Sequence, residues 1–117
     1  MGMRELLEEA GYPYETTLRR FSNNEALLKK FLCRFAEDPT FGELTKGIED
    51  KDYEKILMQA HTLKGVGANL GFDQLSQECA EIVSAVREER YEDIQPFFER
   101  AQREYDSVIA CVSKIEA

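Results

Sequence analysis

The stretch 60–71 contains the only histidine of the chain, His61, inside a segment whose apolar residues recur at helical spacing. On a helix that turns about 100° per residue, His61 lies on the flank of the apolar stripe, Gly65 lies one turn further along that flank, and Ala68 lies near the next turn. Lys64, three residues after His61, is within side-chain reach. A neutral imidazole nitrogen is a competent nucleophile near neutral pH, because the unperturbed pKa of this group is about 6.5. The segment therefore offers a candidate nucleophile with small residues and an ammonium beside it.

Two glycines in this segment leave two interpretations open. Gly65 and Gly67 each cost roughly 1 kcal/mol of helix stability relative to alanine at an exposed position. In one interpretation, the helix needs a bare surface so that another molecule can approach closely. In the other, the glycines let a neighbouring helix pack tightly, and His61 is a border residue with a satisfied hydrogen bond.

The segment that carries His61 is expected to be an amphipathic helix. It should begin near Asp52, with Asp50 or Asp52 as its N-cap, and it should end at Gly71, where a left-handed backbone conformation is favourable for glycine. Its buried stripe consists of apolar and small residues at helical spacing, namely Tyr53, Ile56, Leu57, Ala60, Leu63, Gly67 and Leu70.

Helices are also predicted elsewhere, and no stretch has the period-two alternation of a strand. Ser22 or Asn23 should cap the helix at about 24–37, and Asp73 should cap the helix at about 73–89. Pro96 is acceptable in the first turn of the helix that begins near residue 93. Leu18 and Phe21 should cover one end of the bundle. The expected ranges are about 4–10, 24–37, 40–49, 73–89 and 93 to the end.

These elements predict an all-α fold in a single domain that spans residues 1–117. Short connections favour antiparallel neighbours. We therefore expect an antiparallel up-down-up-down four-helix bundle with short additional N-terminal helices. The core bundle should cover about 24–116, and residues 1–22 should form an N-terminal helical cap.

The net charge of −8 over 117 residues limits the partners of the protein. An acidic surface argues against binding to nucleic acid or to an anionic membrane. No apolar run approaches the roughly 20 residues that span a bilayer, and the sequence shows no secretory signal. Three widely spaced cysteines, Cys33, Cys79 and Cys111, are typical of reduced thiols. We therefore expect a cytoplasmic protein.

Three other functions can be compared with the residues present: a zinc site, a Cys–His enzyme and a scaffold without chemistry. One histidine and three cysteines match a zinc ligand count, but no pair has the close Cys-x₂₋₄-Cys spacing. A Cys–His nucleophilic enzyme is disfavoured because no cysteine lies at helical spacing from His61. A non-catalytic helical interaction or scaffold bundle remains the main alternative, and it predicts a buried or blocked His61.

The motif His61-Thr62-Leu63-Lys64-Gly65, followed by Gly71 ten residues after the histidine, resembles the signature of histidine-containing phosphotransfer (HPt) domains. The resemblance extends to the run 18–21, to the run 28–35 and to the pair 52–53. Val66 departs from the pattern, since many members have a small polar residue there.

The resemblance implies a phosphorelay intermediate of a two-component signalling system without kinase activity. His61 would be phosphorylated on Nε2, Lys64 would neutralise part of the phosphoryl charge, and Gly65 and Ala68 would allow close approach. The implied partners are response-regulator receiver domains in a sensor histidine kinase pathway. The metal would belong to the partner, so this chain should need no metal and no cofactor, and a monomer is expected.

The resemblance also suggests a docking surface on the exposed part of the histidine helix and its neighbour. By position, its residues would be Met58, Thr62, Gln74 and Leu75. For Met58 and Leu75 the alternative is ordinary packing in the core.

Overall fold

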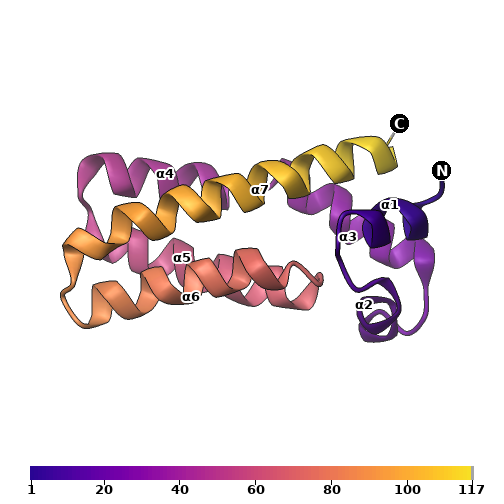
Figure 1. Ribbon diagram of the computed structural model, residues 1–117, viewed down its shortest axis with the longest axis horizontal. Coiled ribbons are helices and arrows are strands. Elements are labelled where there is room, and N and C mark those ends of the chain that lie inside the picture. The colour runs from indigo at the N-terminus through magenta and orange to yellow at the C-terminus, as the bar shows by residue number, and fades with distance from the viewer. Residues whose placement is uncertain (117) are drawn as a thin grey trace.

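The computed structural model describes residues 1–116 and is all-helical over that range (Figure 1). The all-α class is therefore confirmed. The helices are α1 (Met3–Glu9), α2 (Tyr14–Arg20), α3 (Glu25–Glu37), α4 (Thr40–Asp50), α5 (Tyr53–Asn69), α6 (Asp73–Arg87) and α7 (Ile94–Glu116), with a 3-10 turn, η1 (Tyr91–Asp93), before α7.

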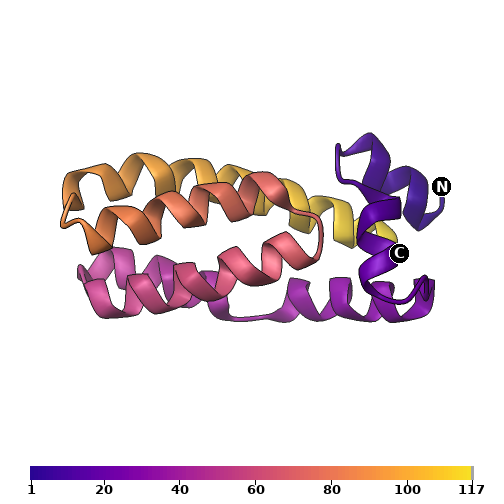
Figure 2. The ribbon, with the colours of Figure 1, turned by 90° about the horizontal axis from the view of Figure 1, so that it is seen from below.

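The helices α3 to α7 lie along the long axis of a molecule that measures 42 × 24 × 20 Å, and α2 runs across that axis (Figure 1 and Figure 2). Figure 2 shows α3 and α4 end to end along one edge, with α5, α6 and α7 running beside them. The helix α5 packs against α4 and α6, and α7 packs against α6 and α3. Pro39 separates α3 from α4, and the Asp38 carboxylate accepts a hydrogen bond from the Thr40 backbone nitrogen at 2.7 Å. This break follows from the proline, which cannot continue the helical hydrogen-bond ladder.

An aromatic cluster joins the ends of the helices inside the bundle. The ring centroid of Phe35 lies 5.5 Å from that of Phe72, and the centroid of Phe41 lies 4.1 Å from that of Tyr105. Tyr12, from the loop after α1, meets Phe72 edge to face at 4.9 Å. The cluster therefore ties the N-terminal segment, α3, α4 and α7 to the turn that follows α5.

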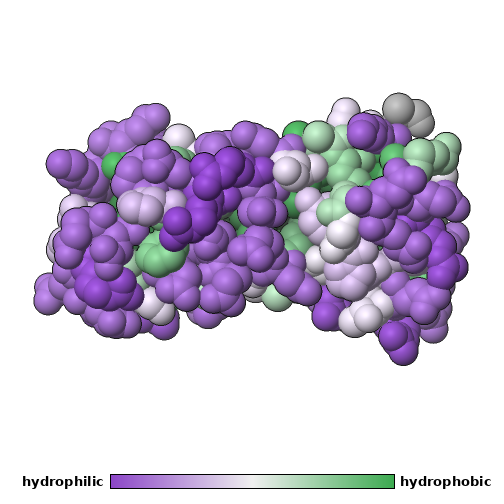
Figure 3. Space-filling view, in the orientation of Figure 1, coloured by the Kyte–Doolittle hydropathy of each residue, from purple (hydrophilic) through white to green (hydrophobic). Residues whose placement is uncertain are grey.

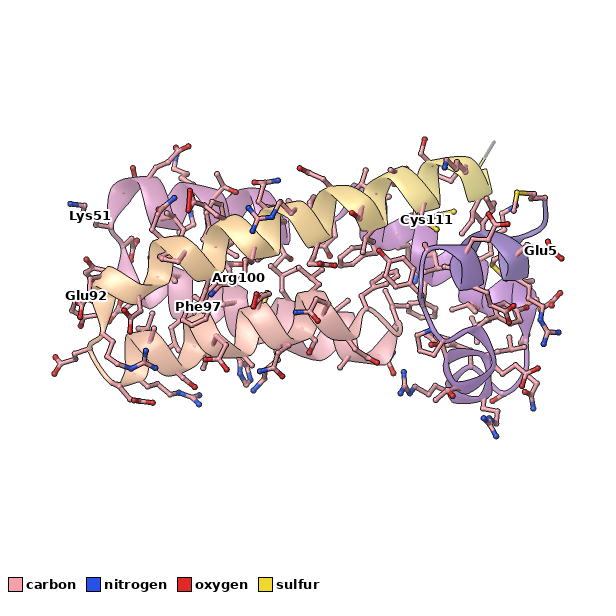
Figure 4. The ribbon with its side chains drawn as sticks, in the orientation of Figure 1. Glu5, Lys51, Glu92, Phe97, Arg100 and Cys111 are labelled. Atoms are coloured by element: carbon pink, nitrogen blue, oxygen red, sulfur yellow. The ribbon has the colours of Figure 1, made fainter. Side chains whose placement is uncertain are left out.

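A polar contact joins α6 to α7. Glu78 is only 5% exposed, and its carboxylate accepts a hydrogen bond from Nε of Arg100 at 3.1 Å. The guanidinium of Arg100 also lies over the ring of Phe97, 4.7 Å from its centroid (Figure 4). A buried carboxylate needs such a partner, because an unpaired buried charge is strongly destabilising.

The structure corrects two of the predicted caps and confirms a third. Asn24, and not Ser22 or Asn23, caps α3 by accepting from the Leu27 backbone nitrogen at 3.0 Å. Ser22 and Asn23 instead form a tight turn with φ of 57° and 58°. Asp52 caps α5 as expected, accepting from the Lys55 nitrogen at 3.2 Å.

Asp73 does not cap α6, because it is already the first residue of that helix. The N-cap is Phe72, whose side chain makes no capping hydrogen bond. Phe72 is 1% exposed, so the burial of its ring fixes where the helix begins.

The N-terminal segment forms two short helices, α1 and α2, as the expected additional N-terminal helices would. Leu18, expected only to cover one end of the bundle, lies within α2, and Phe21 follows directly as its C-cap. The helix α2 lies against the end of α5, where the Arg20 guanidinium donates hydrogen bonds to the backbone oxygens of Ala68 at 2.8 Å and Asn69 at 3.3 Å.

The surface is largely hydrophilic on the face that Figure 3 shows, with an apolar area toward the end where α1 meets α7. Within residues 1–116, no helix combines the length and the apolar character that crossing a membrane would require.

Gly71 is the position in the fold where a side chain should be least tolerated. Its φ is +85°, and a Cβ atom there would lie 2.3 Å from Oγ1 of Thr17, which is 2% exposed. Gly71→Ala should therefore lower the free energy of unfolding by about 2 kcal/mol or more, measured by urea denaturation. The control is Gly42→Ala, which meets nothing within 4 Å on helix α4 and should slightly stabilise the protein. Equal effects of the two substitutions would contradict the prediction.

Candidate functional site

The helix α5 has one buried face and one exposed face, and His61 lies on the exposed one. Asp52 caps its first turn, and Ile56, Ala60 and Leu63 are each at most 2% exposed. His61 follows Ala60 and so turns out of the core. The interpretation of His61 as a buried or blocked residue is therefore wrong.

A shallow groove of about 360 Å³ lies beside the imidazole. Its lining residues are His61, Met58, Leu57, Glu54 and Arg87. Met58 is 65% exposed, so an apolar side chain faces solvent next to the candidate nucleophile.

Three residues of the groove were not among the predicted site residues, and Leu57 was placed instead on the buried stripe of its helix. Glu54 and Leu57 precede His61 by seven and four residues, so helical spacing alone places them on its side of α5. Arg87 comes from the last turn of α6. The short turn between α5 and α6 indicates an antiparallel pair, but the level at which Arg87 meets α5 depends on the packing of the two helices.

Lys64 is half-buried on the turn after His61. It has no ion-pair partner among the described residues, so its ammonium is not committed to a surface salt bridge. Its backbone oxygen accepts a hydrogen bond from Oγ of Ser76 on α6 at 2.8 Å. The ammonium is therefore available to an anion while the backbone beneath it is held in place.

The two glycines of α5 have different surroundings. A Cβ atom on Gly65 would meet nothing within 4 Å, so this position is a bare patch of exposed helix. A Cβ atom on Gly67 would lie 3.5 Å from the Phe72 oxygen and 3.6 Å from the Ser76 nitrogen. Gly67 thus faces the neighbouring helix, where a Cβ would make ordinary van der Waals contacts, and Gly65 faces solvent. Close approach of another molecule at Gly65 stays a prediction.

The predicted docking residues divide into exposed and buried ones. Thr62, Ala68 and Gln74 are exposed, and the Thr62 hydroxyl donates to the Met58 backbone oxygen at 3.1 Å. Leu75 is 1% exposed and packs in the core, so its assignment to a docking surface is wrong. Its position belongs to the apolar stripe of α6, with Cys79 and Ile82.

The cysteines do not gather near His61. Cys79 and Cys111 are buried, Cys33 is half-buried, and burial raises the pKa of the Cys79 thiol to about 12. Among residues 1–116, no three side chains of the metal-binding types come together.

The chain is similar to a protein family and to a curated relative. The family model described as Hpt domain matches residues 26–111. The phosphorelay intermediate protein YPD1 of Candida albicans is 34% identical over 59 residues, which are 50% of this chain and 31% of that relative. The chain thus aligns with less than a third of the relative's length. No solved structure gives a significant match.

The exposure of His61 predicts that its side chain contributes little to folding. His61→Gln should change the free energy of unfolding by no more than about 0.5 kcal/mol, because surface substitutions away from special features have small effects. The matched control is Leu63→Ala, two residues away on the buried face, which should cost about 2–5 kcal/mol. Urea denaturation of both variants measures this, and a large loss for His61→Gln would place the ring in the core.

Proposed function

Because this chain belongs to the Hpt domain family, we propose that it is a phosphorelay intermediate of a two-component signalling system, with His61 as the residue that carries the phosphoryl group. The single observation that carries the proposal is the exposure of the imidazole on the outer face of α5, beside an apolar groove. The relative from Candida albicans, a phosphorelay intermediate by its name, supports the same role.

The proposed reaction is an in-line displacement at phosphorus. The lone pair of Nε2 attacks the phosphorus of an aspartyl phosphate on the partner, and the new P–N bond forms as the P–O bond to the aspartate breaks. The bonding pair leaves on the carboxylate oxygen, and the proton of the imidazole stays on Nδ1. Such transfers depend on positioning and charge stabilisation more than on covalent chemistry by the protein.

Two positively charged side chains lie near the proposed reaction centre, although the chain as a whole carries a net charge of −8. Lys64 lies one turn from His61 and is unpaired among the described residues, and Arg87 lines the groove with His61. A point cation and a guanidinium both stabilise negative phosphoryl oxygens. We propose Lys64 as the phosphate-stabilising residue and Arg87 as a second cation at the same site.

The partners we propose are receiver domains of response regulators, which would both donate to and accept from His61. A receiver must bring its aspartate to within bonding distance of Nε2, so a flat, bare surface is needed around the ring. Gly65 and Ala68 supply that surface, and Met58, Thr62 and Gln74 are the docking residues that remain after Leu75 is excluded. The protein would act as a monomer in the cytoplasm, as a carrier without kinase activity.

We also propose that the helices form the antiparallel up-down-up-down arrangement expected of the family, in one domain over residues 1–117. In this arrangement α3 and α4 together make the first arm of the bundle, and Pro39 divides it. The end-to-end placement of α3 and α4 along one edge supports this assignment. Residues 1–22 would be a helical cap on the core bundle of 24–116.

The decisive experiment mixes the purified protein with a receiver domain that carries a ³²P-labelled aspartyl phosphate. The wild type should acquire acid-labile, base-stable label, because a phosphoryl group on an imidazole nitrogen has that stability. His61→Gln should acquire none. Label on His61→Gln, or an unlabelled wild type with every receiver tested, would instead favour the non-catalytic scaffold.

A second experiment tests close approach at Gly65. Gly65→Gln should fold normally, since nothing lies within 4 Å of the added Cβ, but it should slow transfer from the receiver by about tenfold or more. Transfer from the small donor phosphoramidate should change by no more than about twofold, because no protein then has to approach the ring. An equal loss with both donors would show that Gly65 acts on the chemistry and not on docking.

A further inference from the structure

The part of α5 that follows His61 is intrinsically weak as a helix. Gly65 and Gly67 lie within one turn, and glycine has a low helix propensity. The last carbonyl groups of any helix also lack partners within that helix. The turn that carries Lys64 therefore depends on groups outside α5 for its rigidity.

One such group is Arg20, at the end of α2. Its guanidinium donates to the backbone oxygens of Ala68 at 2.8 Å and Asn69 at 3.3 Å. Within α5 neither oxygen has a donor, but the Gly71 N–H just beyond the helix donates to the Ala68 oxygen at 3.2 Å, so Arg20 adds a second donor there. A cation at a helix C-terminus also interacts favourably with the helix dipole. Arg20 is far from His61 in sequence, yet it closes the end of the histidine helix.

The other group is Ser76, on α6. Its hydroxyl donates to the Lys64 backbone oxygen at 2.8 Å. The helix α6 lies close to α5 here, since a Cβ on Gly67 would be in ordinary van der Waals contact with the Ser76 backbone nitrogen at 3.6 Å. Within an α-helix, the Ala68 N–H pairs with the Lys64 carbonyl, so the contacts of Ser76 and Arg20 hold the two ends of one helical turn.

We propose that Arg20 and Ser76 are positioning residues for phosphoryl transfer, which hold the backbone of Lys64 so that its ammonium stays beside His61. This inference rests on the proposed function of His61 and Lys64. Neither residue touches the phosphoryl group; each acts through the turn from Lys64 to Ala68.

The test uses phosphoramidate as the donor, because a small molecule removes any effect of docking. The lone pair of Nε2 forms a new P–N bond, the P–N bond of the donor breaks, and ammonia leaves with its electron pair. Arg20→Ala and Ser76→Ala should each lower the rate of phosphohistidine formation by about twofold to tenfold, the range expected for loss of a hydrogen bond. Arg20→Lys, which keeps a cationic donor, should recover part of the rate.

Matched controls and a double-mutant cycle separate positioning from a general loss of stability. Arg19→Ala, the neighbouring exposed arginine on α2, and Ser113→Ala, an exposed serine on α7, should both react at the wild-type rate. In a Lys64→Ala background, Arg20→Ala and Ser76→Ala should cause no further loss, because the residue that they position is gone. All rates are measured well below the thermal unfolding midpoint of each variant.

Amide hydrogen exchange gives a readout that does not depend on catalysis. Arg20→Ala should speed the exchange of the amides of residues 68–70, and Arg19→Ala should not. Rates equal to the wild type in Arg20→Ala and Ser76→Ala, or losses that add fully to that of Lys64→Ala, would overturn the inference while leaving the proposed function intact. A wild type that takes no phosphoryl group from any donor would overturn the proposed function. Unchanged amide exchange in Arg20→Ala would independently overturn the claim that Arg20 holds the end of α5.

Discussion

The structure depends on one constraint: α5 must be held firmly along one side while its other side stays uncovered. A helix in water gains most of its stability from packing one face, and α5 obtains that packing from α4 and α6. The contacts that hold α5 therefore come from the helices on its buried face and from residues at its two ends. The result is an exposed ring on a backbone that other helices fix, without any group covering the ring.

The short turn between α5 and α6 determines how these two helices pack and therefore which side chains of α6 lie near His61. Phe72 is buried at this turn, and Gly67 and Ser76 meet on either side of it. Because the two helices pack closely from this point on, α6 brings Arg87 level with the groove beside His61. One close approach of two helices thus sets where Lys64 and Arg87 lie relative to His61.

The sequence predicted the helices because they follow from local periodicity, whereas periodicity placed His61 only on the flank of the apolar stripe and left its exposure open. The apolar stripe of α5, its cap at Asp52 and its end at Gly71 were all visible in the order of residues. Leu75 was assigned to the docking surface from the family resemblance, although its spacing with Cys79 and Ile82 places it on the buried stripe of α6. Asp73 is the first residue of α6 and not its cap. The contact of Arg20 with Ala68 joins residues 48 positions apart, and no spacing rule connects an exposed arginine to a distant carbonyl.

The contact of Arg20 with the end of α5 bears on which residues a version of this domain should include. The family match starts at residue 26, after both α1 and α2, so the matched region does not contain Arg20, which contacts the end of α5. A shortened version that retains only the matched region would keep the histidine, the lysine and both glycines. It would lack Arg20, so the Ala68 and Asn69 oxygens at the end of its histidine helix would lose the guanidinium that donates to them here.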